Sequence, residues 1–181
     1  MKKTICIMCL ALCFSFSTET NAQEKIYPVI KSGGGIFIVP EAVPLVDVKM
    51  KYKILVEIAT LAAKPDSVHA SLDKLARLIN LHIAADIPKK NLEVVAVFHN
   101  AASPIILSDE AYQKKFNVPN PNTALINELA ANGVQFFICG QSLRIRKLTD
   151  EKRNPNFKVA QSALLTISTF QLKRFVLVPL Q

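Results

Sequence analysis

The chain has 181 residues, of which half are hydrophobic and only a fifth are charged, and this balance excludes an intrinsically disordered protein. Its formal net charge of +8 would suit a nucleic-acid ligand, but the basic residues are mostly dispersed along the chain. We interpret the charge as general solubility, with a preference for anions near Arg144, where the one basic cluster lies.

The first 22 residues are typical of a secretory signal peptide. Two lysines form a basic start, an apolar run follows over residues 5–16, and residues 20–22 (Thr-Asn-Ala) supply a cleavage site. The apolar run is shorter than the about 20 residues that a membrane-spanning helix needs. We therefore expect an exported, periplasmic protein whose mature chain begins at Gln23. An uncleaved anchor, or a lipoprotein modified at Cys13, is the less favoured alternative.

Removal of this segment changes the cysteine count and the charge. Three of the four cysteines lie in it, so the mature chain keeps only Cys139 and has no internal disulfide. Two lysines and one glutamate are lost as well, which lowers the formal net charge from +8 to +7. The remaining residues, 23–181, suit one domain that folds on its hydrophobic core alone. No membrane span and no nucleic-acid partner are expected for this mature chain.

Residues 23–50 are predicted to form an irregular N-terminal arm. Three prolines and the run Gly33-Gly34-Gly35 interrupt any regular pattern. The glycines do not form a phosphate-binding loop, because no Gly-Lys-Ser/Thr follows them. We expect a flexible arm that packs on the domain or on a neighbouring subunit.

Residues 51–181 alternate between predicted strands and predicted helices. Strands are expected over residues 53–59, 92–98, 134–139 and 175–180. Helices are expected over residues 66–87, 110–116, 121–131, 142–148 and 159–171. Asn120 is the expected N-cap of the third helix, and the last helix is expected to bury Ala160, Ala163, Leu164, Ile167 and Phe170. The alternation indicates an α/β domain with a mainly parallel sheet and helices on both faces.

Parallel sheets of this kind bind ligands beyond the carboxyl ends of their strands. Four polar or small residues close or follow the two central strands: His99, Asn100, Cys139 and Gly140. Backbone N–H groups at the helix start after Cys139, and the nearby Arg144, would favour its thiolate form. His99 is a candidate base or hydrogen-bond partner for that thiol. The alternatives stay open: Cys139 as a buried small residue, and His99 as a residue that caps a strand.

Two other chemistries are excluded by spacing. The chain has no Cys-x-x-Cys, which excludes dithiol exchange of the thioredoxin kind within one chain. Its three histidines form no close pair and are accompanied by a single mature cysteine, so no metal site is predicted. His69 and His82 are expected to be solvated, and no cofactor is expected.

Five short motifs follow one another along the mature chain. They are residues 92–102, which end in His99-Asn100-Ala101-Ala102, then 106–112 (ILSDEAY), 120–122 (NPN), 129–142 (LAANGVQFFICGQS) and 160–178. In this order they resemble the exported branch of the DsrE/DsrF-like family, over nearly all of the mature chain. The resemblance implies a flavodoxin-like three-layer sandwich with a sheet of four to five strands, residues 51–181 as the DsrE-like domain, and assembly into trimers or hexamers.

The sulfur-relay members of that family carry sulfur as a persulfide on a cysteine that matches Cys139. The resemblance therefore implies that Cys139 accepts sulfur, and it marks His99, Asn100, Asn120 and Ser142 as matching positions. A thiolate that attacks a polarised sulfur becomes Cys–S–SH, which a second thiol then accepts.

From these observations we predict a sulfur-binding or sulfur-transfer protein that uses Cys139, with His99 and Arg144 as modulators. An anionic donor such as thiosulfate or polysulfide would suit the basic edge, and a sulfur donor or acceptor protein is the expected partner. One alternative is a non-catalytic oligomeric α/β module that binds a small ligand or a protein at the same edge. Another is a redox-sensing thiol that forms mixed disulfides between chains.

Overall fold

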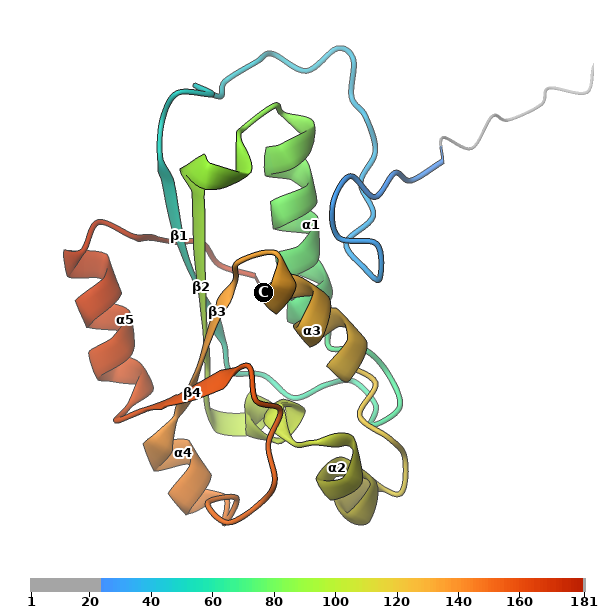
Figure 1. Cartoon of the computed structure of the whole chain (residues 1–181), viewed down its shortest axis with the longest axis vertical. Coiled ribbons are helices and arrows are strands. Elements are labelled where there is room, and N and C mark those ends of the chain that lie inside the picture. The colour runs from blue at the N-terminus through green and yellow to red at the C-terminus, as the bar shows by residue number, and fades with distance from the viewer. Residues whose placement is uncertain (1–23, 181) are drawn as a thin grey trace, which may run out of the picture.

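The structure is a computed structural model that describes residues 24–180 (Figure 1). The predicted signal peptide lies outside the described residues. The strands are β1 (Tyr52–Ile58), β2 (Leu92–Phe98), β3 (Gln135–Cys139), β4 (Phe157–Ala160) and β5 (Val176–Leu177). The α-helices are α1 (Ala70–Ala84), α2 (Asp109–Phe116), α3 (Thr123–Ala131), α4 (Gly140–Ile145) and α5 (Ala163–Leu172). Two 3₁₀ helices, η1 (Lys89–Asn91) and η2 (Asn100–Ile106), flank β2.

The five strands form one sheet in the order β4-β3-β2-β1-β5, and every neighbouring pair is parallel. From β1 to β4 the chain steps one strand at a time in the same direction, and then it returns past β1 to reach β5. Because parallel crossovers are right-handed, the return places its helix on the opposite face of the sheet. Figure 1 shows α1 and α3 on one side of the sheet and α5 on the other. The predicted α/β, flavodoxin-like three-layer sandwich is confirmed.

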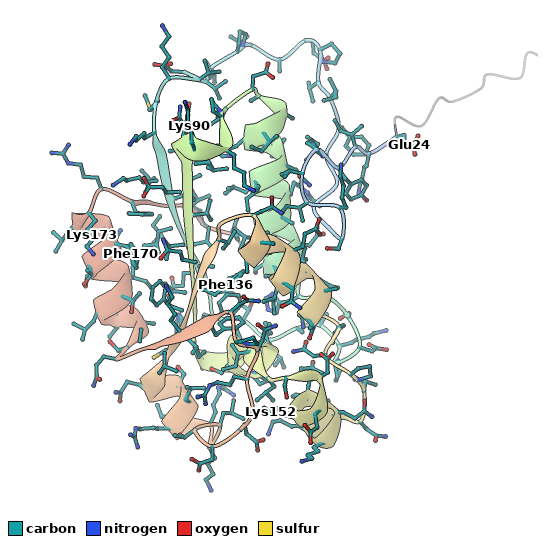
Figure 2. All side chains as sticks on the ribbon, in the orientation of Figure 1. Glu24, Lys90, Phe136, Lys152, Phe170 and Lys173 are labelled. Atoms are coloured by element: carbon teal, nitrogen blue, oxygen red, sulfur yellow. The ribbon has the colours of Figure 1, made fainter. Side chains whose placement is uncertain are left out.

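The hydrophobic core has two parts, one on each face of the sheet. Alternate strand residues point to opposite faces, so Val56 packs toward α1 and α3 whereas Leu55 packs toward α5. The larger part contains Phe136 and the smaller part contains Phe170, both labelled in Figure 2. Cys139 belongs to the smaller part, against which α5 packs.

One strand was missing from the sequence prediction. Residues 157–160 form β4, although a helix was expected from residue 159, and α5 begins only at Ala163 with Ser162 as its N-cap. Phe157 explains the strand, because its ring packs 5.1 Å from Phe98 in the larger core. The later start of α5 changes which of its residues face the core, and Leu164, which was expected to be buried, is 82% exposed.

Three other helices begin elsewhere than expected. α1 begins at Ala70 after the N-cap His69, whose Nδ1 accepts a hydrogen bond from the Ser71 amide. α3 begins at Thr123 with Asn122 as the N-cap residue, and α4 begins at Gly140, directly after β3.

The prediction that two histidines are solvated is wrong for His69. It is 1% exposed, and its Nε2 lies 2.9 Å from the Thr60 carbonyl oxygen. His82 is half-buried, with its Nδ1 2.7 Å from the Leu78 carbonyl oxygen. Both rings therefore support the local fold around α1.

The first part of the N-terminal arm packs against α1. Between residues 24 and 51 the structure has no helix or strand apart from the bridge between Ile26 and Ile36. Gly34 has a φ of +65°, and a Cβ atom there would lie 2.1 Å from the Arg77 backbone nitrogen. The glycine run is thus needed for close packing of the arm on the helix.

Candidate functional site

Cys139 and His99 lie on neighbouring strands at the carboxyl edge of the sheet. Phe98 pairs with Ile138, and His99 and Cys139 are the next residues of these two strands, so they lie side by side. The backbone at His99 is still extended, and its N–H donates to the Ile58 carbonyl oxygen at 3.1 Å. Cys139 and Val97 point toward α5, and strand alternation places the His99 side chain on that face too.

Cys139 is 5% exposed and lies at the first turns of two helices, α4 and α5. Burial raises the pKa of its thiol, but hydrogen bonds to the sulfur outweigh this effect and hold the pKa below its ordinary value. The donors are the Ser142 hydroxyl and the backbone amides of Ser142, Ala163 and Gln141. They favour the thiolate, which is the nucleophilic form of cysteine.

The Ser142 hydroxyl is oriented by the loop that follows β2. Its oxygen accepts a hydrogen bond from the Asn100 amide at 2.9 Å, which leaves its proton free to be donated to Cys139. Asn100 has a φ of +49°, and its side-chain oxygen accepts from Arg146 Nη2 at 3.0 Å. The Asn100 carbonyl oxygen accepts from the Ser103 hydroxyl at 2.7 Å. The loop is thereby held against α4.

His99 is paired with a carboxylate that the sequence analysis did not single out. His99 Nε2 lies 2.7 Å from Glu57 Oε1, and the two side chains are 23% and 41% exposed. His99 is not among the groups that bond to the Cys139 sulfur. The available signal for Glu57 was a carboxylate near the end of β1, after the apolar run from Ile54 to Val56.

A hollow of about 260 Å³ lies beside α4 and β4, and its lining begins with the residue that follows Cys139 in the sequence. Gly140 and Arg144 line it, together with Gln141, Leu143, Thr149, Val159, Ala160 and Gln161. A Cβ atom on Gly140 would lie 2.9 Å from the Ala160 carbonyl oxygen, so glycine permits this close approach. Arg144 gives the hollow a positive charge.

The comparison with protein families decides the relationship of the chain. The model of the DsrE/DsrF-like family matches residues 55–179, from within β1 to beyond β5. The chain belongs to the DsrE/DsrF-like family. No curated protein matches it.

Two solved structures are similar to this DsrE/DsrF-like chain. One is a protein of unknown function, MTH1491 from Methanobacterium thermoautotrophicum, with 16% identity and a TM-score of 0.54. The other is the ychN protein from E. coli, with 13% identity and a TM-score of 0.48. Each comparison covers 71% of this chain and 98% of the other chain. The first of these likenesses supports the fold.

Asn120 lies in the loop between α2 and α3, apart from the hydrogen bonds around Cys139. It is buried, and its Nδ2 donates to the carbonyl oxygens of Ile105 and Leu107, both at 2.8 Å. Its Oδ1 accepts from the Asn122 amide at 3.0 Å. These contacts hold the loop, and a binding role for Asn120 stays a prediction.

Within residues 24–180, no three histidine, cysteine, aspartate or glutamate side chains gather in a way that could hold a metal ion. In the same range, no helix combines the length and the apolar character needed to cross a membrane.

Proposed function

We propose that this DsrE/DsrF-like protein binds sulfur as a persulfide on Cys139 and passes it to a second thiol. The observation that carries the proposal is the set of hydrogen bonds that holds the pKa of Cys139 below its ordinary value. Its place at the carboxyl edge of a parallel sheet, where such folds bind ligands, adds support. Family membership supports the same chemistry, because sulfur relay is common in the family.

The reaction needs a donor with a sulfur–sulfur bond, and inorganic polysulfide is the simplest probe. The Cys139 thiolate attacks a terminal sulfur of Sₙ²⁻ and forms the S–S bond of Cys139–S–S⁻. The S–S bond of the donor breaks, and Sₙ₋₁²⁻ leaves with the electron pair. The thiolate of an acceptor then attacks the outer sulfur, and Cys139 leaves as a thiolate. Arg144 beside the hollow suits an anionic donor.

Incubation of the native protein with polysulfide is expected to add the mass of one sulfur atom, at Cys139. Intact mass spectrometry measures the gain, and Cys139→Ser is expected to show none.

The proposed export to the periplasm is tested by expression of the full chain, which includes residues 1–22. The mass of the untreated protein is then expected to match a chain that begins at Gln23.

The rival proposal is a non-catalytic module that binds a ligand or protein at the same edge. It rests on the burial of Cys139, which is 5% exposed. A native protein that gains no sulfur and resists alkylation, while the unfolded protein is alkylated, would favour this rival and exclude the redox-sensing thiol as well.

We further propose that the protein forms a homo-oligomer, a trimer or a hexamer, through the face that carries α5. The helix has no charged residue, and its Leu164, Leu165 and Leu172 side chains are largely exposed. Exposed apolar patches of this kind mark interaction surfaces.

Leu165→Glu combined with Leu172→Glu is expected to lower the molar mass in solution to that of one chain, because charges would be buried in the interface. Light scattering after size exclusion measures this mass. Leu61→Glu, an equally exposed leucine in the loop after β1, is the control and is expected to leave the oligomer intact. A wild-type protein with the mass of a single chain would contradict the proposal.

A further inference from the structure

Glu57, His99 and Cys139 form a row across three adjacent strands at one face of the sheet. Glu57 pairs with Val97 in the register of β1 and β2, and His99 follows Val97 by two residues. Leu55 and Val97 belong to the core toward α5, so alternation places Glu57 and His99 on that face with Cys139. Neighbouring strands are about 4.8 Å apart, which makes His99 the neighbour of both other residues.

The contact between Glu57 and His99 selects one form of the imidazole ring. A carboxylate only accepts hydrogen bonds, so the 2.7 Å contact requires His99 Nε2 to carry a proton. In a neutral ring the other nitrogen, Nδ1, then has a free lone pair and is the proton acceptor.

Glu57 is the charged group that contacts the His99 side chain. α5, which covers the same face of the sheet, has no charged residue. Arg146 Nη2 donates to the side chain of the next residue, Asn100, at 3.0 Å. Lys53 lies at the other end of β1, with its Nζ 5.4 Å from the Phe175 ring centre. Glu57 is thus the group that determines which of the two ring nitrogens of His99 carries the proton.

A hollow of about 270 Å³ reaches Glu57 from the side of the C-terminal segment, with residues 177–180 as its other lining. The acidic partner of His99 is therefore next to open space at the edge where a donor or acceptor would approach. This placement is unlike that of the carboxylate Glu93, which stands at the opposite end of β2.

We propose that Glu57 is a positioning residue that fixes His99 with Nδ1 as the proton acceptor for Cys139. The inference rests on the proposed sulfur transfer. Before the attack, Nδ1 takes the proton of the Cys139 thiol and so supplies the thiolate that attacks the donor, and the resulting imidazolium faces the Glu57 carboxylate. When Cys139 is released as a thiolate in the second step, Nδ1 returns the proton.

The test compares the rates of sulfur gain from polysulfide in single-turnover experiments. Glu57→Gln is expected to slow the rate about tenfold, and His99→Gln by at least as much, since general acid–base catalysis contributes about 10²- to 10⁴-fold. In the His99→Gln background, Glu57→Gln is expected to have no further effect. Glu93→Gln makes the same change on the same strand face, about 20 Å from His99 at 3.3 Å per residue, and is expected to leave the rate unchanged.

Nitrogen chemical shifts of the His99 ring supply a second readout that is independent of activity. The wild-type ring is expected to carry its proton at Nε2, and Glu57→Gln is expected to mix the two tautomers, because an amide both donates and accepts. Unfolding in urea checks that Glu57→Gln leaves the fold intact.

The outcomes separate the inference from the proposed function. A wild-type protein that gains no sulfur contradicts the proposed function and the proton transfer with it. Sulfur gain at the same rate in wild type and Glu57→Gln contradicts the inference alone. A wild-type ring protonated at Nδ1, or equal effects of Glu57→Gln with and without His99, overturns it as well.

Discussion

Asn80→Ala is expected to destabilise the protein by about 3 kcal/mol or more and to release the N-terminal arm. Asn80 is fully buried on α1, and its Oδ1 accepts from the amides of Val29 and Ile30 at 3.0 and 2.8 Å. Its Nδ2 donates to the carbonyl oxygens of Ile30, Gly33 and Gly34. Each buried backbone group left unpaired costs about 1–3 kcal/mol. Urea unfolding measures the loss, and limited proteolysis measures exposure of the arm.

Asn91→Ala is the matched control, because the Asn91 side chain donates one exposed hydrogen bond, to the Val48 carbonyl oxygen. It is expected to change stability by less than about 1 kcal/mol. If Asn80→Ala were no more destabilising than Asn91→Ala, the arm would not be anchored through Asn80.

Ser142→Ala is expected to slow sulfur gain and alkylation at Cys139 about tenfold at neutral pH. A hydrogen bond to a charged group contributes about 1.5 kcal/mol or more, and its loss raises the pKa of the Cys139 thiol. The thiolate fraction at neutral pH then falls, and the rate falls with it. Alkylation rates measured across a range of pH values report the change as a shift of the inflection to higher pH.

Ser103→Ala is the control for this prediction. Ser103 is also buried, and its hydroxyl donates to the Asn100 carbonyl oxygen in the same loop, without contact to the sulfur. Ser142→Thr keeps the hydroxyl and is expected to keep most of the rate. Equal slowing by Ser142→Ala and Ser103→Ala would assign the effect to the loop and not to the hydrogen bond.

The long apolar segments could be predicted from the sequence, and the short ones could not. The strand Leu92–Phe98 was predicted with the bounds that the structure has, because its five consecutive apolar residues from Val94 to Phe98 leave little ambiguity. β4 has four residues and no clear alternation, so its pairing with β3 depends on the aromatic cluster around Phe157, which is a tertiary contact. Helix starts were missed where a buried side chain, such as His69, serves as the cap.

The position of the candidate site could be predicted from the sequence, whereas most of its contacts could not. Topology alone places His99, Asn100, Cys139 and Gly140 at one edge of the sheet. The partners of the thiol depend on where α4 and α5 begin, and both starts were predicted incorrectly. Glu57 was missed because its role comes from a strand pairing that spans 42 residues of sequence.

The central claim is that the fold makes Cys139 a reactive thiolate. The most direct measurement is the rate of Cys139 alkylation in the native protein as a function of pH. The structure predicts one inflection, below the pKa of the same thiol in the unfolded protein. An inflection at or above that value, or a thiol that reacts only after unfolding, would contradict the claim.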